Sequence, residues 1–233
     1  MARFRYAYAI ATWNGARLVE TIQSIPKGSR LLVVDNSIYG WPLSKAWNFA
    51  INRLCREEGF DVAIIMNDDI VLRPTTGEEL ASALLERQFT MGYDRELLLI
   101  SARHANHGDM FTDEVNWKLL NAKNPEFQPG PDFSCFATTR KLFDNVGEFD
   151  EHFNPAYYED NDMHRRIQLA GFEAYAYAPY WHYRSMTVRT SDERRGMLGA
   201  AQAKCRDYYI AKWGGIPGDE KYITAFNRGF ARV

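Results

Sequence analysis

The stretch VAIIMNDDIVLRP, residues 62–74, is the part of the chain on which the fold prediction depends. Its first apolar run is typical of a buried strand and ends at Asn67, Asp68 and Asp69. A second apolar run and an Arg-Pro pair follow. Adjacent carboxylates at the end of a buried strand repel each other and resist the loss of their water. We therefore expect a cation close to this strand end.

The rest of the first half alternates short apolar runs with helical patterns. Further strands are expected over residues 4–12, 30–35 and 96–101, and helices over 16–25, 43–54 and 77–88. A capping box that begins at Thr76 is expected to start the last of these helices. Such alternation favours βαβ units, and therefore an α/β fold with a mostly parallel sheet flanked by helices.

The second half begins with a long polar segment, residues 102–132, which indicates a functional loop or an excursion of short strands. After it we expect five elements, in this order: a strand, a short helix that Gly147 ends, a helix with acidic residues in its first turn, a strand and a last helix. Their ranges are 133–139, 140–147, 157–171, 172–179 and 191–215.

Composition argues against several classes of protein. The 233 residues are 46% hydrophobic, which is enough for a packed core, and the net charge of −2 indicates no bulk attraction to nucleic acid or membranes. No segment approaches the roughly 18 apolar residues of a membrane helix, and the N-terminus lacks the apolar core of a signal peptide. Three widely spaced cysteines, Cys55, Cys135 and Cys205, suit buried free thiols. We expect a soluble cytoplasmic protein without membrane insertion.

Polar residues follow three of the expected strands, namely Trp13-Asn14, Asp35-Asn36 and Asn67 to Asp69. In an open α/β sheet, ligands bind outside the carboxyl ends of the strands. Carboxylates there favour Mg²⁺ or Mn²⁺ shared with substrate phosphates. Trp13 could then stack on a nucleobase, with core packing as its alternative, and Asp35 could accept from a base imide, with helix capping as its alternative.

The polar strand ends and the acidic helix start, taken in their order along the chain, resemble those of the glycosyltransferases of the GT-A fold, especially family two and its rhamnosyltransferase-like members. ATWNGA (11–16), VVDNSIYG (33–40) and IMNDDIVLRP (65–74) are similar to the family's first turn, its Asp-Asn-Ser strand end and its DxD motif. The segment from VGEFDE to WHYRSMT (146–187) looks like the family's Gly-x-Phe-Asp-Glu, Glu-Asp-x-Asp and histidine series. YYIAKWGGIPGDEKY (208–222) resembles a Lys-Trp-Gly ending found in some members.

The resemblance implies one GT-A domain over residues 1–233 with a Rossmann-like sheet and a C-terminal extension on the acceptor side. Residues 1–101 would bind the nucleotide-sugar, 102–190 would hold the acceptor and the catalytic residues, and 191–233 would form the helical extension. The implied reaction is metal-dependent transfer of a hexosyl or pentosyl group from a nucleotide-diphosphate sugar to an acceptor hydroxyl, with inversion at the anomeric carbon.

The resemblance also assigns donor contacts by position. Thr12, Trp13 and Asn14 would contact the donor, and Asp35 would bind its base or ribose. Asn67 takes the first place of the DxD motif and Asp68 its variable middle place, and both are candidate donor-binding residues.

Asp69 takes the last place of the motif and is the implied ligand of Mn²⁺ or Mg²⁺. Successive strand side chains point to opposite faces, which also separates Asp69 from Asp68. His182 matches a histidine that approaches the metal or the diphosphate, with a packed core histidine as the alternative.

The implied catalytic base is Asp160, with Glu159 orienting the acceptor or positioning that base. A helix N-terminus favours a charged carboxylate, so we expect Asp160 to be ionised at neutral pH. The alternative is an acidic first turn that serves only the helix dipole. His104 and His107 are expected on a surface loop.

Two other functions stay open, a metal-dependent nucleotidyltransferase and a non-catalytic module that binds a nucleotide or sugar. The sequence does not identify the acceptor, which could be a glycan, a protein, a metabolite or modified nucleic acid. The donor nucleotide and the oligomeric state are equally undetermined.

Overall fold

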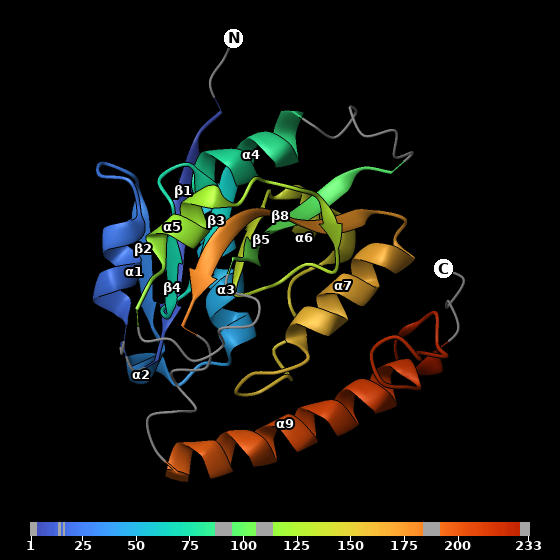
Figure 1. Cartoon of the computed structure of the whole chain (residues 1–233). Coiled ribbons are helices and arrows are strands. Elements are labelled where there is room, and N and C mark those ends of the chain that lie inside the picture. The colour runs from blue at the N-terminus through green and yellow to red at the C-terminus, as the bar shows by residue number, and fades with distance from the viewer. Residues whose placement is uncertain are drawn as a thin grey trace.

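The computed structural model describes residues 4–13, 15, 17–86, 95–105, 114–183 and 192–228, with only the backbone of residues 192–195. Within these residues the chain forms one eight-stranded sheet with helices on both faces (Figure 1). Its strands are β1 (Tyr6–Thr12), β2 (Leu31–Asp35), β3 (Val62–Asn67), β4 (Ile70–Leu72), β5 (Leu97–His104), β6 (Gln128–Pro129), β7 (Cys135–Thr138) and β8 (Glu173–His182).

The strand order is β2-β1-β3-β7-β5-β8-β4, and β6 pairs with β8. β1, β2 and β3 are parallel to one another, and β5 and β8 run in the same direction as these three. The short strands β4, β6 and β7 run antiparallel to their neighbours. The predicted α/β fold with a mostly parallel sheet flanked by helices is therefore confirmed.

The helices follow the predicted order. They are α1 (Leu18–Ser24), α2 (Asn36–Tyr39), α3 (Leu43–Ile51) with a π-helical continuation η1 (Asn52–Glu57), α4 (Thr76–Glu86), α5 (Trp117–Ala122), α6 (Lys141–Val146), α7 (Glu159–Leu169), α9 (Asp192–Trp213) and the 3₁₀ turn η2 (Ala225–Asn227). The polar segment that follows β5 thus contains a short helix and a two-residue strand.

Alternating strand residues build a separate core on each face of the sheet. Ala9 and Ile65 pack with residues of α3, α6 and α7 on one face. Tyr8 and Ile64 pack with residues of α4, and with Ile25 after α1, on the other. Both faces of β1 and β3 are therefore buried, which explains why these strands read as continuous apolar runs.

Gly77 allows α4 to lie directly on β1. A Cβ atom at this position would lie 1.9 Å from the hydroxyl oxygen of Tyr8, which is fully buried. Any larger residue would push the helix away from the sheet, so glycine is required here by packing.

The predicted capping box at Thr76 is wrong. The Thr76 hydroxyl donates to the carbonyl oxygen of Pro179 at 2.9 Å, so it ties α4 to β8. The Glu79 carboxylate pairs with Arg73 at 2.6 Å, so it does not reach back to the start of the helix. Tertiary contacts have taken both side chains that a capping box needs.

No helix in the described part of the chain is long and apolar enough to cross a bilayer. Cys55, Cys135 and Cys205 are free thiols and all three are buried, as predicted.

Candidate active site

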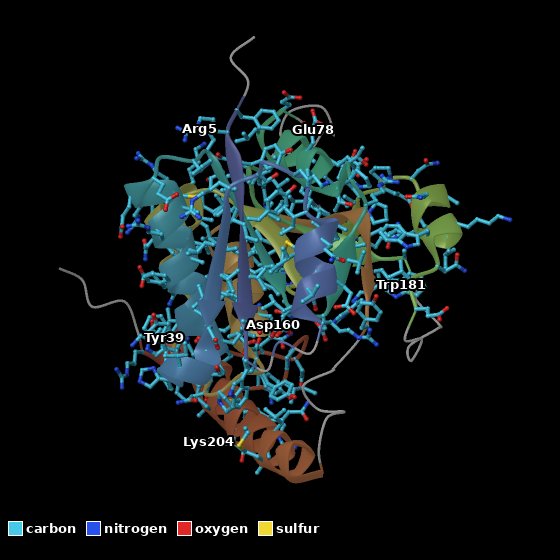
Figure 2. All side chains as sticks on the ribbon, turned by 90° about the vertical axis from the view of Figure 1, so that its left-hand side faces the viewer. Arg5, Tyr39, Glu78, Asp160, Trp181 and Lys204 are labelled. Atoms are coloured by element: carbon cyan, nitrogen blue, oxygen red, sulfur yellow. The ribbon has the colours of Figure 1, made fainter. Side chains whose placement is uncertain are left out.

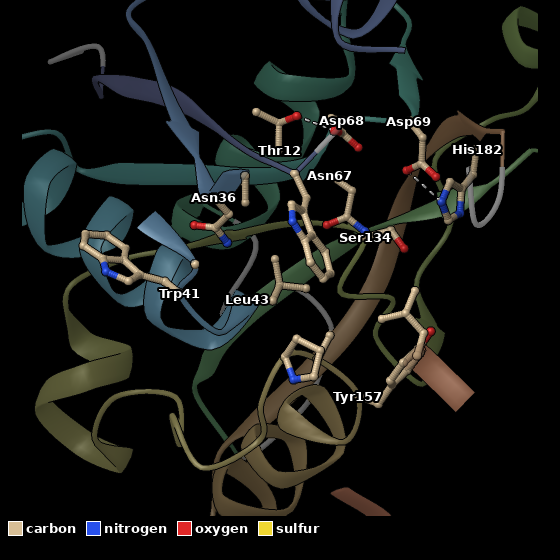
Figure 3. A pocket seen from close by; sticks show the side chains of 16 residues that line it. Thr12, Asn36, Trp41, Leu43, Asn67, Asp68, Asp69, Ser134, Tyr157 and His182 are labelled. Carbon is tan, nitrogen blue, oxygen red and sulfur yellow. Dashed lines mark hydrogen bonds and ion pairs between the residues drawn. The ribbon is translucent and has the colours of Figure 1, made fainter. Parts of the chain in front are cut away.

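A pocket of about 310 Å³ lies at the carboxyl ends of β1, β2 and β3 (Figure 3). The strand register brings these ends together, because Thr12 pairs with Asp35 and Ala11 pairs with Asn67. The predicted site residues that line the pocket are Thr12, Trp13, Asn67, Asp68, Asp69 and His182. Asn36, noted in the sequence as part of the polar Asp35-Asn36 strand end, also lines the pocket. Residues that the sequence did not single out complete the lining, namely Ala11, Gly40, Trp41, Leu43, Ser134, Pro155, Ala156, Tyr157 and Leu198.

Asp68 fixes the turn that follows β1. Its Oδ2 accepts a hydrogen bond from the Thr12 hydroxyl, and the Thr12 oxygen in turn accepts from the Gly15 N–H at 3.1 Å. Burial raises the pKa of Asp68, while the bonds from Thr12 and from the backbone of Gly15 and Trp13 favour its charged form. Thr12 and Asp68 therefore hold Trp13 at the pocket through contacts within the protein.

Asp69 and His182 form the second pair of the pocket. β4 begins just after Asp69 and pairs antiparallel with β8, so that Ile70 lies opposite His182. The Tyr183 N–H also donates to the Asp69 carbonyl at 2.9 Å. This pairing places His182 Nε2 3.2 Å from Asp69 Oδ1, at the wall of the pocket (Figure 3).

The ligand atoms of Asp69 and His182 suit a divalent cation that takes only some of its ligands from the protein. Mg²⁺ commonly takes one or two carboxylates, with substrate phosphates and water completing its shell. In the described residues, no group of three or more His, Cys, Asp or Glu side chains converges as a metal site. One carboxylate and one imidazole at an open pocket fit a cation that arrives with a substrate.

Trp13 and Asn36 offer contacts of a different kind to a ligand. Trp13 is 36% exposed, so it is not an ordinary core tryptophan. Asn36 is 7% exposed, and its side-chain oxygen has no hydrogen-bond partner among the described residues. A buried acceptor without a partner is costly, and a ligand N–H or O–H in the pocket would satisfy it.

Asp35 caps the short helix α2. Its Oδ1 accepts from the Ser37 N–H at 2.9 Å and from the Ser37 hydroxyl at 2.5 Å. Asp35 is not among the lining residues, whereas its neighbour Asn36 is. The capping alternative describes this geometry, and contact of Asp35 with the donor stays a prediction. Asn14, the remaining predicted donor contact, lies outside the described residues.

Glu159 and Asp160 begin α7, directly after the pocket wall formed by Pro155 to Tyr157. Tyr157 and Tyr158 have φ values of 86° and 71°, a left-handed conformation that costs a non-glycine residue about 1–3 kcal/mol. Such strain concentrates at active sites. Glu159 and Asp160 do not themselves line the pocket, and Figure 2 shows Asp160 at the end of the sheet that faces α9.

Burial controls the protonation of this carboxylate pair. Glu159 is 4% exposed, and burial followed by the charge of Asp160 raises its pKa well above the usual range. Burial also raises the pKa of Asp160, although the Asn161 N–H donates to its Oδ1 at 2.8 Å. The direction is opposite to the one expected from the helix N-terminus alone, because loss of water outweighs the helix dipole.

A second polar cluster was missed by the sequence reasoning. His104, expected on a surface loop, ends β5 and pairs through Nε2 with Asp132, which also accepts from the Tyr180 hydroxyl at 2.7 Å. Burial opposes the charge of Asp132, but His104, the Ser134 N–H and Tyr180 hold its pKa well below the usual range. The His104 ring lies 5.0 Å from that of His182. His107 lies outside the described residues.

Neither a protein-family model nor a curated protein sequence matches the chain. Among solved structures, it is similar to A197 from STIV, with 11% identity, a TM-score of 0.45, and coverage of 76% of this chain and 83% of that one. It is also similar to glucosyl-3-phosphoglycerate synthase from Mycobacterium tuberculosis in complex with Mn²⁺, UDP-glucose and phosphoglyceric acid, with 14% identity, a TM-score of 0.43, and coverage of 86% and 80%.

A third similar structure is the mannosyltransferase PcManGT from Pyrobaculum calidifontis in complex with GDP-Man and Mn²⁺. Its identity is 14% and its TM-score 0.49, and the match covers 88% of this chain and 64% of that one. At such identities and scores, these similarities assign neither a family nor an activity to the chain. Its function has to be inferred from its own residues.

Proposed function

We propose that the chain is a GT-A glycosyltransferase that moves a sugar from a nucleotide-diphosphate donor to an acceptor hydroxyl, with a divalent cation and with inversion. One observation carries the proposal. A single pocket brings together the exposed face of Trp13, the Asp69–His182 pair and the wall that leads into Glu159 and Asp160. These are the groups that a nucleobase, a metal-bound diphosphate and an attacking hydroxyl each require.

In this proposal the donor lies across the ends of β1, β2 and β3. Its base stacks on Trp13, where one stacking contact is worth about 1–3 kcal/mol in nucleic-acid binders. The side-chain oxygen of Asn36 accepts a hydrogen bond from the base or ribose, and Asn67 reaches the ribose or a metal-bound water. Thr12 and Asp68 act indirectly by holding the turn that presents Trp13.

Asp69 and His182 hold Mn²⁺ or Mg²⁺ together with the donor diphosphate. When bound, the cation supplies positive charge that offsets the charge developing on the departing diphosphate. The register of β4 on β8 supports this role, because it pairs Asp69 with His182 without a ligand, so that little order would have to be gained on binding.

Asp160 is the proposed base, which takes the proton of the acceptor hydroxyl as that oxygen attacks the anomeric carbon. General-base assistance contributes typically about 10²–10⁴-fold in rate. A partly buried carboxylate with a raised pKa holds a proton more tightly once it has accepted it, which suits this role. Burial raises the pKa of Glu159 well above its usual range, so Glu159 keeps its proton more readily than an exposed glutamate. A protonated Glu159 places no second negative charge beside Asp160.

The proposal includes the division of the domain into a donor half (1–101), an acceptor and catalytic half (102–190) and a helical extension (191–233). It also includes a cytoplasmic location, which the three buried free thiols support.

Incubation with a panel of UDP-, dTDP- and GDP-sugars in Mn²⁺ tests the proposal even without the natural acceptor, because water can replace it slowly. We expect release of nucleoside diphosphate from at least one donor, and loss of that release when EDTA removes the metal. Formation of nucleoside triphosphate and sugar 1-phosphate when pyrophosphate is added to the same donors would instead indicate a nucleotidyltransferase. Tight donor binding without any turnover, with all candidate acceptors supplied, would indicate a binding module.

A further inference from the structure

Helix α9 connects the pocket with a buried ionic network. Near its start, Leu198 lines the pocket. Near its end, Lys212 is only 6% exposed. An α-helix rises 1.5 Å per residue, so the 14 residue steps from Leu198 to Lys212 span about 21 Å. Figure 1 shows this helix lying across the end of the domain, beside the start of α7.

The ammonium group of Lys212 bridges two carboxylates from different segments. Its Nζ lies 2.6 Å from Asp150 Oδ2, in the loop that follows α6, and 2.6 Å from Asp162 Oδ1, in the first turn of α7. Asp162 is fully buried, and it lies two residues after Asp160 on the same helical turn. Lys212 therefore ties α9 to the turn that carries the proposed base.

The remaining hydrogen-bonding capacity of Asp162 is also used. Trp213 Nε1 donates to Oδ1 at 2.9 Å, and Arg166 Nε donates to Oδ2 at 2.9 Å. The Asp162 N–H donates to the Tyr158 carbonyl at 2.9 Å. A buried network in which every member is paired favours one arrangement, because removing one member leaves a buried charge unpaired.

Asp150 receives equally many partners. Besides Lys212, its carboxylate accepts from the Tyr208 hydroxyl at 3.0 Å and contacts His152 Nδ1 at 2.8 Å. Although burial acts against its charge, Lys212 and His152 hold the pKa of Asp150 well below its usual range. The Asp150 carboxylate is therefore charged beside Lys212 at neutral pH.

The loop before α7 is also hydrogen-bonded to α3. The Asn48 amide donates to the Phe149 carbonyl at 2.9 Å and accepts from the Phe149 N–H at 2.8 Å. Asn48 belongs to α3, which packs on the sheet. The loop that carries Pro155 to Tyr157 is thus held between α3 and α9.

From these contacts we infer that Lys212 is a positioning residue, which fixes the first turn of α7 and thereby the direction of Asp160 relative to the pocket. The inference rests on the proposed function, because it concerns the base of that reaction. Lys212 is not among the residues that line the pocket. Its ion pairs are with Asp162 and Asp150, so it acts on Asp160 indirectly.

The test compares Lys212→Met with Lys212→Arg, which keeps a cation that can reach both carboxylates. Lys204→Met is the matched control, because Lys204 lies on the same helix and is exposed (Figure 2). For each variant we measure kcat for donor turnover and the Kd of the nucleoside diphosphate with Mn²⁺. Hydrogen exchange of amides 158–165 reports on the first turns of α7 independently of activity.

We expect Lys212→Met to lower kcat at least tenfold, to leave Kd within twofold, and to speed exchange of these amides at least tenfold. Lys212→Arg should keep kcat within about threefold, and Lys204→Met should match the wild type. An unchanged kcat in Lys212→Met, or a loss of nucleotide affinity as large as the loss of kcat, would overturn the inference. If Lys212→Met does not fold, Lys212→Gln combined with Asp150→Asn is measured against the same limits.

Failure of the proposed function has a different outcome. The wild-type protein would then release no nucleoside diphosphate from any donor, and the role of Lys212 in catalysis would fall with it. If the proposed function holds but the role of Lys212 is wrong, the wild type would be active and the Lys212→Met variant would be equally active.

Discussion

The buried carboxyl of Glu159 gives a prediction about stability that does not depend on finding the substrate. Its side chain is 4% exposed, and Oε2 has no hydrogen-bond partner among the described residues. Burial and the neighbouring charge of Asp160 raise its pKa well above the usual range. The folded state therefore prefers the protonated form, whereas the unfolded state releases the proton near the ordinary glutamate pKa.

This difference fixes the sign of the pH dependence. A group whose pKa is raised on folding stabilises the fold at pH values below its unfolded pKa, and the stability is lost as pH rises through the folded pKa. Between the two values, one proton of difference lowers the free energy of unfolding by about 1.4 kcal/mol per pH unit. The loss starts near the unfolded glutamate pKa of about 4.3.

Glu159→Gln keeps the shape of the side chain and removes the charge. The wild type loses about 1.4 kcal/mol of stability for each pH unit above its unfolded pKa, up to the folded pKa, and the neutral glutamine does not have this loss. We therefore expect the variant to be about 1–3 kcal/mol more stable than the wild type at pH 7.5, and equally stable at pH 4. The assay is urea unfolding followed by circular dichroism at intervals of half a pH unit.

Glu78→Gln is the matched control. Glu78 also lies in the acidic first turn of an 11-residue helix, α4, but it is exposed. Its removal should cost a few tenths of a kcal/mol through the helix dipole. The account of Glu159 is refuted if Glu159→Gln is destabilised at pH 7.5, or if the stability of the two variants depends on pH in the same way.

Three further predictions concern catalysis, metal binding and packing. Asp160→Asn should lower the rate of sugar transfer by about 10²–10⁴-fold while nucleotide affinity stays unchanged, and a variant that transfers normally would show that Asp160 is not the base. In the wild type, transfer should fall as pH decreases, and this fall should occur above the ordinary aspartate pKa of about 3.9, because burial raises the pKa of Asp160. Asp69→Ala should abolish the Mn²⁺ dependence of nucleotide binding in calorimetric titration, and an unaltered dependence would remove Asp69 from the metal site. Gly77→Ala should cost about 1–3 kcal/mol in urea unfolding, because its Cβ meets the Tyr8 hydroxyl, whereas Gly199→Ala in α9, where no atom lies within 4 Å, should not destabilise.

The sequence predicted the sheet well because its strands are buried on both faces or end in polar residues. The runs that became β1, β2 and β3 were recognised from their apolar residues, whereas the apolar run after Asp69 was noted but not predicted as the short strand β4. Local patterns sufficed there because hydrophobic periodicity follows directly from burial. The capping box at Thr76 failed because a contact with β8, distant in sequence, claimed the hydroxyl.

The site was predicted in part for the same reason. Residues at strand ends, such as Asp69, could be placed because strand ends of a sheet meet at one edge. The register of β4 on β8, which brings His182 to Asp69, is a long-range contact that no local pattern encodes. Asp132 carries no local signal either, and Asn36 was noted only as part of the polar Asp35-Asn36 strand end, since single polar residues in a loop are common. Their importance depends on what folds against them.

The most direct test of the central claim is a crystal structure of the protein with Mn²⁺ and the nucleoside diphosphate that the donor panel identifies. We expect the nucleobase to lie against Trp13, the cation to be bound by Asp69 and His182, and the diphosphate to complete the coordination of that cation. A nucleotide bound outside this pocket, or a cation that does not contact Asp69, would contradict it.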